Sequence, residues 1–325
     1  MKEKKQSLIE RRDFLKLSAA VALGLYMAPF ASFGMNNFSF QPQKRKFGKI
    51  DFNVTTLGLG GQAALQLTPE DTDPVAIILK AINLGINFLD ASNLYGSSQL
   101  NYAKAFRQLN LIPGEINYEH NLRESIFLNS KSCIRWAKGN YPELNNVFNR
   151  TNGEHGGGAI ADLKRALSQM FGDGQGNYPD GAYLDMFMVH NVNTMEEIDV
   201  LYKGLETPLN KGENFGALVA LRDYRDGTSH TGLNPKHERL IRHLGFSGHS
   251  TPAMIELIQR DVFGLLEGML APINVNDRLM FNMQHNVIPV ATAKNMAVIG
   301  MKVFADGVLY GKEPRWSMST DNVLT

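Results

Sequence analysis

Short apolar runs alternate with longer amphipathic segments along the chain from residue 46 onward. Most of the runs show little apolar–polar alternation, which is typical of strands buried on both faces of a sheet. Seven strands are predicted in this way: Thr55–Gly60, Ile86–Ala91, Ser125–Ser130, Leu184–His190, Leu244–Ser247, Gly268–Asn274 and Val298–Phe304. Helical periodicity lies between them in Asp73–Leu84, Ala159–Phe171 and Pro252–Gln259. This alternation implies a parallel sheet with right-handed crossovers, either a closed barrel or an open doubly wound sheet.

Three further segments depart from the simple alternation. Residues 47–54 predict a small hairpin ahead of the first strand. Asn110–Arg123 and Glu206–Lys236 are longer than ordinary connections, and a helix is predicted over Asn214–Tyr224 in the second of them. Long loops at the carboxyl ends of barrel strands usually shape a substrate pocket. We expect that role for both stretches, with a plain surface insertion as an equal alternative.

The first 34 residues have the pattern of an export signal. A basic start is followed by Arg11-Arg12-Asp13-Phe14-Leu15-Lys16 and a weakly apolar stretch, residues 17–30, that is too short to span a membrane core of about 30 Å. The paired arginines resemble a twin-arginine (Tat) signal. We therefore expect a signal over 1–34, a linker over 35–45 and the globular domain over 46–325. This implies a periplasmic or exported protein, the Tat machinery as a partner and no stable membrane anchor; the alternative is a buried amphipathic helix.

Composition narrows the class of protein. Among 325 residues, 43% are hydrophobic and 20% charged, which suits a globular domain with a large core. The 33 basic and 32 acidic residues balance, so no nucleic-acid partner is predicted. Cys133 is the single cysteine, which excludes an intrachain disulfide and an all-cysteine metal site. The histidines of the loops show no ligand spacing, and no metal site is expected.

Polar residues that can act in catalysis lie at or just after the ends of three predicted strands. Asp90 ends the second strand and Tyr95 comes five residues later, Lys131 follows the third strand, and His190 ends the fourth. The carboxyl ends of parallel barrel strands meet on one face, where active sites lie. We therefore expect these four residues, the tetrad, to converge. Singly, each has a structural alternative: a core tyrosine, an ion pair at a barrel end, or a histidine at a strand terminus.

The order and context of the tetrad resemble the aldo/keto reductase family: strand–Asp-x4-Tyr-Gly, strand–Lys and Tyr-x-Asp-x4-His. Four other segments share the resemblance, which covers about residues 46–311: Leu57–Gly61, Gly85–Asp90, Gly245–His249 and Gly300–Leu309. It implies a (β/α)8 TIM-type barrel, NADP or NAD as cofactor and a small-molecule carbonyl or sugar substrate. It further implies a set of cofactor-binding residues: Gly60, Gly61, Asp90, Ser247, Asn274 and Lys302.

The resemblance also implies a role for each member of the tetrad. A nicotinamide would supply the hydride and Tyr95 the proton. A neighbouring ammonium favours the phenolate, which is the role of Lys131, and Asp90 keeps that ammonium charged and oriented. His190 would hydrogen-bond the substrate oxygen. The reaction implied is the interconversion of a carbonyl and an alcohol.

Two departures from the family pattern limit these expectations. Gly248 stands where the family commonly has asparagine, and the usual glutamine of the sixth strand is not evident. The chain stops where an eighth strand and a last helix are expected, so the prediction is a barrel that lacks both, with no choice between NADH and NADPH. Two other functions stay open: a non-catalytic nucleotide-binding or regulatory barrel protein, and an inactive truncated family member.

Overall fold

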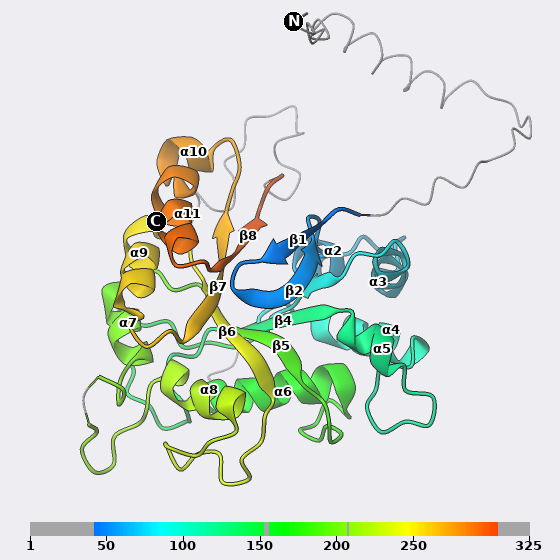
Figure 1. Cartoon of the computed structure of the whole chain (residues 1–325). Coiled ribbons are helices and arrows are strands. Elements are labelled where there is room, and N and C mark those ends of the chain that lie inside the picture. Colours follow the sequence, from blue (N-terminus) through cyan, green and yellow to red (C-terminus); the bar gives the residue numbers. More distant parts are fainter. Residues whose placement is uncertain (1–41, 153–155, 207, 305–325) are drawn as a thin grey trace, which may run out of the picture. The chain divides into compact units, whose positions relative to one another are not determined.

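The computed structural model describes residues 42–304, apart from 153–155 and 207 (Figure 1). The predicted signal, most of the predicted linker and the residues after Phe304 lie outside this part of the chain. The prediction of a missing eighth strand and last helix therefore also lies outside it.

Six parallel strands form one curled sheet whose spatial order equals the sequence order. They are β3 (Phe88–Asp90), β4 (Phe127–Ser132), β5 (Leu184–Val189), β6 (Ile241–Ser247), β7 (Leu266–Pro272) and β8 (Ala297–Met301). The register places Asp90 beside Asn129 and Lys131 beside Met188. Sequential parallel pairing with a helix between most strands is the arrangement of a TIM-type barrel, which the sheet fits.

The prediction of a strand over Thr55–Gly60 is wrong about its length. Only Leu59 pairs with β3: its N–H donates to Phe88 O at 2.9 Å, and its carbonyl accepts the Asp90 N–H at 2.9 Å. Thr55 instead ends β2 (Ile50–Thr55), which pairs antiparallel with β1 (Lys44–Phe47). The hairpin prediction is thus confirmed, and β1 begins inside the segment expected to be linker. Glycines flank Leu59 on both sides, and glycine weakens a strand because it loses more backbone entropy and has no side chain to pack.

The hairpin packs against the interior of the sheet. Gly48 lies against the backbone of Asn295–Ala297, and the Lys49 N–H donates to Asn295 O at 2.7 Å. One apolar cluster joins hairpin and strands: Phe47, Ile50, Val54, Phe88, Phe127, Met186, Met188, Leu270 and Ala297. Gly268 leaves room for it, because a Cβ there would lie 2.7 Å from Met186 Cε. The interior is therefore filled with side chains, as in barrels of this class.

Helices cover the outer face of the sheet (Figure 1). The predictions over Asp73–Leu84, Ala159–Phe171 and Pro252–Gln259 are confirmed, and the helix expected over Asn214–Tyr224 begins three residues later. Their bounds are α3 (Pro74–Asn83), α4 (Ser98–Gln108), α6 (Ala159–Phe171), α7 (Met195–Leu201), α8 (Ala217–Asp226), α9 (Thr251–Arg260) and α11 (Met283–Ala293), with short turns α2 (Ala63–Gln66), α5 (His120–Glu124) and α10 (Asp277–Met280). Between residues 42 and 304, none of the described helices has the length and apolarity needed to cross a membrane.

The two long stretches are not the strand-to-helix loops that the sequence suggested. Asn110–Arg123 joins α4 to β4, and Glu206–Lys236 lies between α7 and β6, so both lead into strands. The long connection that leaves a strand is instead β4–α6. The second stretch still approaches that connection, because Gly216 forms an antiparallel bridge with Trp136. Asn110–Arg123 thus leads to the amino end of β4, whereas part of the second stretch lies beside the β4–α6 connection.

Candidate active site

Lys131 and Asp90 form a buried ion pair at the carboxyl ends of β4 and β3. Lys131 Nζ lies 2.6 Å from each Asp90 carboxylate oxygen and donates to Ala91 O at 2.7 Å, and its side chain has no exposed surface. Burial lowers the pKa of Lys131, while the charge of Asp90 and its hydrogen bonds oppose that shift. Asn129 Nδ2 adds a 2.6 Å bond to Asp90 Oδ1. The carboxylate thus fixes both the charge and the position of the ammonium.

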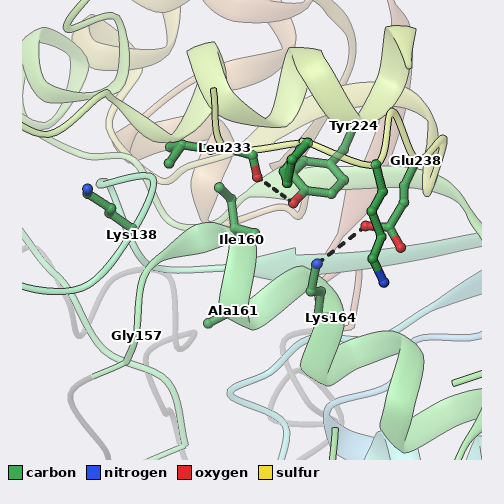
Figure 2. Close-up of a pocket in the computed structure, with 10 residues that line it drawn as sticks. Lys138, Gly157, Ile160, Ala161, Lys164, Tyr224, Leu233 and Glu238 are labelled. Carbon is green, nitrogen blue, oxygen red and sulfur yellow. Dashed lines mark hydrogen bonds and ion pairs between the residues drawn. The ribbon is translucent and has the colours of Figure 1, made fainter. Parts of the chain in front are cut away.

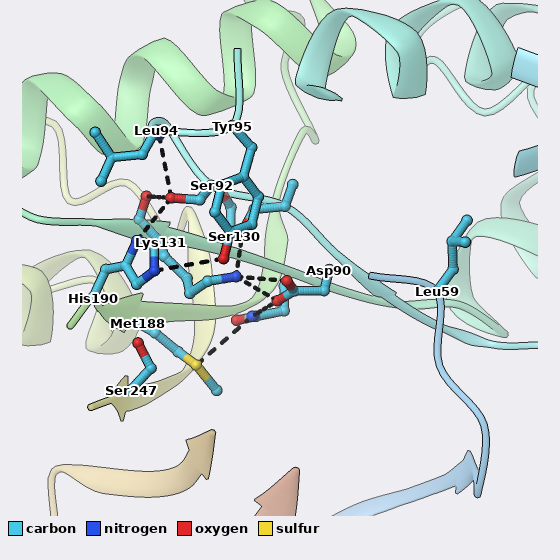
Figure 3. Close-up of polar contacts among 12 residues, drawn as sticks. Leu59, Asp90, Ser92, Leu94, Tyr95, Ser130, Lys131, Met188, His190 and Ser247 are labelled. Atoms are coloured by element: carbon cyan, nitrogen blue, oxygen red, sulfur yellow. Dashed lines mark hydrogen bonds and ion pairs between the residues drawn. The ribbon is translucent and has the colours of Figure 1, made fainter. Parts of the chain in front are cut away.

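Tyr95 lies over this pair, in the turn that leads from β3 to α4. Lys131 Nζ is 4.7 Å from the centre of the Tyr95 ring. The phenol oxygen is 3.5 Å from His190 Nε2, and the two rings are perpendicular with centres 5.6 Å apart. Only 7% of the Tyr95 surface is exposed. Figure 3 shows the four side chains of the tetrad gathered at the ends of three neighbouring strands, as the sequence predicted.

His190 directly follows β5 and is buried. Burial, and after it the positive charges of Lys131 and further cationic groups that include Arg135 and Lys302, hold the pKa of His190 well below its ordinary value. The imidazole is therefore neutral at pH 7 and carries a proton on one ring nitrogen only. Its Nδ1 lies 3.0 Å from Ser92 Oγ.

Two of the six predicted cofactor-binding residues are the glycines beside β3. A Cβ on Gly61 would lie 2.3 Å from Asp90 O, so Gly61 is needed for the close approach of this segment to β3. Gly60 is exposed and has open space around its Cβ position. The glycine pair thus leaves bare backbone beside the tetrad.

Asp90 ends β3, and the other three predicted cofactor-binding residues lie at or just after the ends of later strands. Ser247 is fully buried and its Oγ accepts the Asn191 N–H at 3.0 Å. The positive charge of Lys302 is among the influences that lower the pKa of His190. The Asn274 amide is bonded within its own loop: Oδ1 accepts the N–H groups of Asn276 and Asp277, and Nδ2 donates to Lys302 O at 3.2 Å and to Asp277. Asn274 therefore holds the loop after β7.

His249 lies two residues after the end of β6. Its Nδ1 lies 2.8 Å from Asn191 Oδ1, and its backbone N–H donates to Asn193 Oδ1 at 2.9 Å. Burial and the charge of Lys302 lower the pKa of His249 to about 4. Its Nε2 is buried without a hydrogen-bond partner. Such an atom is costly unless a ligand satisfies it.

A second buried ion pair borders the site. Arg135, after β4, donates from Nη2 to Glu197 Oε1 at 3.0 Å and to Asn191 O at 2.9 Å. Its Nε and Nη1 have no hydrogen-bond partner. Arg135, Ser92 and Asn129 could not be predicted as part of the site, because polar residues within or beside a strand give no periodic signal of a shared site.

Two cavities of the described chain lie away from the tetrad. One, of about 460 Å³, is lined by α6, α8 and the segment before β6, where Lys164 pairs with Glu238 at 3.3 Å (Figure 2). The other, of about 610 Å³, is lined by residues 178–183 and 238–242 near the amino ends of β5 and β6. Within the described chain, no three or more His, Cys, Asp or Glu side chains gather as metal ligands would. The tetrad is thus the group with the clearest chemistry.

A curled parallel α/β sheet with a tyrosine, a buried Lys–Asp pair and a histidine gathered at its strand ends is typical of a TIM-type barrel protein with its active site at that end. Residues 56–318 match the aldo/keto reductase family, and the chain belongs to this family.

Individual relatives are distant. An uncharacterised oxidoreductase of Bacillus subtilis (strain 168), YqkF, is 25% identical over 173 residues, which is 52% of this chain and 46% of the relative. The match thus spans about half of that curated protein. A candidate aldo-keto reductase structure from Pseudomonas aeruginosa gives a TM-score of 0.50 at 19% identity, covering 81% of this chain and 79% of that one. An aldo/keto reductase from Klebsiella pneumoniae, solved with NADP and acetate, gives a TM-score of 0.47 at 15% identity. The match covers 82% of this chain and 70% of that one.

Proposed function

We propose that the protein is an NAD(P)(H)-dependent oxidoreductase that interconverts a small carbonyl compound, an aldehyde, ketone or sugar, and its alcohol. The observation that carries the proposal is the buried Lys131–Asp90 pair placed 4.7 Å from the ring centre of Tyr95, with His190 beside the phenol. Membership of the aldo/keto reductase family supports oxidoreduction and a nicotinamide nucleotide as cofactor.

The four side chains have complementary roles in this proposal. Tyr95 donates its proton to the carbonyl oxygen during reduction, and the ammonium of Lys131 stabilises the phenolate that remains. Asp90 and the Ala91 carbonyl hold that ammonium in place. His190, neutral and buried, donates a hydrogen bond to the same carbonyl oxygen and so orients it. In the alcohol direction the same groups act in reverse.

A bound nicotinamide nucleotide would supply the hydride in reduction and accept it in oxidation. The buried polar atoms near the tetrad fit such a ligand, because His249 Nε2 and Asn129 Oδ1 have no hydrogen-bond partner within the protein. Gly60, Gly61, Asp90, Ser247 and Lys302 would hold it, and Asn274 would act through the position of Lys302. Both NADH and NADPH fit this set.

Two further proposals concern the whole chain. The sheet order and the family support a (β/α)8 barrel as the complete architecture. The paired arginines at residues 11 and 12 support export by the Tat pathway, with the cofactor loaded before translocation. Replacing both arginines by lysine and following the chain in cell fractions tests the second: retention in the cytoplasm supports it, and unchanged export contradicts it.

Tyr95→Phe tests the proposed function, because it removes the phenol oxygen and keeps the ring over Lys131. We expect turnover of aldehyde substrates with NADPH or NADH to fall by roughly 100- to 10,000-fold, the usual worth of a general acid. Nucleotide affinity, measured by fluorescence titration, is expected to change far less, by at most about tenfold, since an ordinary lost hydrogen bond costs about 0.5–1.5 kcal/mol. The matched control is Tyr224→Phe, which removes a hydroxyl bonded to Leu233 O away from the site.

Two results would contradict this assignment. Full turnover in Tyr95→Phe would remove the phenol from the mechanism. Nucleotide binding by the wild type without turnover of any carbonyl substrate would favour the alternative of a regulatory barrel protein. The intact tetrad favours the enzyme, because a purely binding protein has no need of a buried lysine beside a tyrosine.

A further inference from the structure

The hydroxyl of Ser92 lies between His190 and two backbone groups, two residues after Asp90. Ser92 Oγ is 3.0 Å from His190 Nδ1, accepts the Leu94 N–H at 3.2 Å, and lies 3.4 Å from Lys131 O. Figure 3 shows the contacts to His190 and Leu94. Ser92 is 2% exposed, so water does not compete for these bonds. Its single proton has two acceptors within reach, and which of them it takes decides the state of the imidazole.

The carbonyl of Lys131 is already occupied. It accepts the Asn93 N–H at 3.1 Å and Asn93 Nδ2 at 3.3 Å, and a carbonyl oxygen has two lone pairs. Both bonds are shorter than the 3.4 Å contact with Ser92. The proton of Ser92 therefore goes to His190 Nδ1 at 3.0 Å. Because the neutral ring carries one proton, that proton must then lie on Nε2.

We propose that Ser92 is a positioning residue that fixes the tautomer of His190, so that Nε2–H always faces the phenol oxygen of Tyr95 and the substrate carbonyl. The buried Oγ–H of Ser92 donates to Nδ1, and the imidazole acts as a hydrogen-bond donor that neither gains nor loses a proton during turnover. The opposite tautomer would present a lone pair to the carbonyl oxygen and repel it.

This inference rests on the proposed function for its effect on rate, but the tautomer itself is measured without turnover. In protein labelled with 15N-histidine, we expect the His190 Nδ1 resonance of an unprotonated nitrogen and the Nε2 resonance of a protonated one at pH 7. In Ser92→Ala we expect protonation to shift toward Nδ1 and kcat to fall about tenfold, the equivalent of one lost hydrogen bond. Ser92→Thr, which keeps a hydroxyl, is expected to restore both.

Ser130→Ala is the matched control. It also removes a buried serine hydroxyl, which is bonded to Gln99 Nε2 at 3.0 Å, and it leaves the tautomer unchanged in our expectation. A protonated Nδ1 in the wild type, or the same tautomer and rate in Ser92→Ala, would overturn the inference. If the tautomer behaves as expected but no carbonyl compound is turned over by the wild type, the role of Ser92 stands and the proposed function fails.

Discussion

Lys131 carries a positive charge without any exposed surface, and the surroundings explain how it is tolerated. A lone buried ammonium would lose its proton, whereas a carboxylate at 2.6 Å and a carbonyl at 2.7 Å stabilise the charged form. The same low-dielectric surroundings strengthen its effect on the Tyr95 ring. In the proposed mechanism the pair with Asp90 is needed for the chemistry, because a mobile ammonium would give the phenol no constant partner.

The two buried histidines predict a loss of stability in acid. His190 and His249 are neutral in the fold because burial lowers both pKa values, to about 4 for His249, whereas an unfolded histidine titrates near 6.5. Between these values the unfolded state binds more protons, so the free energy of unfolding falls as the pH falls. From His249 alone we expect a loss of about 2 kcal/mol between pH 7 and pH 5.

Urea unfolding at pH 7, 6 and 5 measures this effect. His249→Gln removes the titrating group and should flatten the pH dependence by that amount. His285→Gln is the control, since His285 is exposed on α11. An equal pH dependence in wild type and His249→Gln would show that folding does not lower the pKa of His249.

The sequence predicts those site residues that are marked by their position at a strand end, but not those that join the site through one long-range hydrogen bond. Asp90, Lys131 and His190 were placed together because each ends or follows a buried strand, and strand ends of a parallel sheet converge. The contact between Ser92 and His190 joins residues 98 positions apart through a single hydroxyl. No periodicity or spacing marks such a bond, so Ser92 was found only in the folded structure.

At the scale of elements, the segment around Leu59 holds the end of β3 where Asp90 lies. Its backbone exchanges two hydrogen bonds with Phe88 and Asp90, and Gly61 lies against the Asp90 carbonyl. Tyr102 of α4 donates to the same carbonyl at 3.2 Å. The position of the Asp90 carboxylate, and through it of Lys131, therefore depends on a close approach that only glycine allows.

Gly61→Ala and Gly60→Ala form a matched pair that tests this. A methyl at Gly61 would lie 2.3 Å from Asp90 O, so the strand end must move; we expect a loss of about 1–3 kcal/mol in the free energy of unfolding and a lower kcat. A methyl at Gly60 meets nothing within 4 Å, and we expect stability within about 0.5 kcal/mol of the wild type. Urea unfolding and steady-state kinetics of both variants measure these differences in stability and kcat. Equal effects would show that the Asp90 carbonyl tolerates displacement.

Most strands could be predicted from apolar runs, but their ends were predicted wrongly where polar residues belong to the strand. Strand β6 begins at Ile241, three residues earlier than expected, because Arg242 and His243 interrupt the apolar run without ending the strand. The Arg242 guanidinium lies 3.9 Å from the centre of the Tyr183 ring, and His243 stacks on Phe127. Both side chains find partners across the sheet that no local pattern reveals. Helix α11 was missed for a related reason, since it contains Pro289.

For the described chain as a whole, the packing separates a closed end from a reactive end. The hairpin and the interior methionines and aromatic residues fill the sheet at one side, and the tetrad occupies the other. A buried cluster of Arg123, Asp185 and Tyr183 O ties the connection before β4 to the start of β5. The alternation of strands and helices predicted this layout. The exact fit of hairpin to strand ends depends on tertiary contacts, such as Lys49 with Asn295, and was beyond the sequence.

Cys133 follows β4 in the middle of this packing and can report on the stability of the entire domain. It is the single cysteine of the chain, it has no exposed surface, and burial raises the pKa of its thiol to about 12. Thiol reagents attack the thiolate, so the folded protein offers neither access nor the reactive form. We expect labelling by a chromogenic disulfide reagent at pH 8 to require global unfolding.

The labelled fraction at increasing urea should therefore superimpose on the unfolding curve measured by circular dichroism, provided that the end of β4 opens only when the whole domain unfolds. The control is Cys133→Ser combined with Ser125→Cys, which places a thiol on an exposed position before β4 and should react at once without urea. Rapid stoichiometric labelling of wild-type Cys133 in the absence of urea would mean that the end of β4, and with it Lys131, opens locally. A lysine in such a segment could not keep a fixed place beside Tyr95.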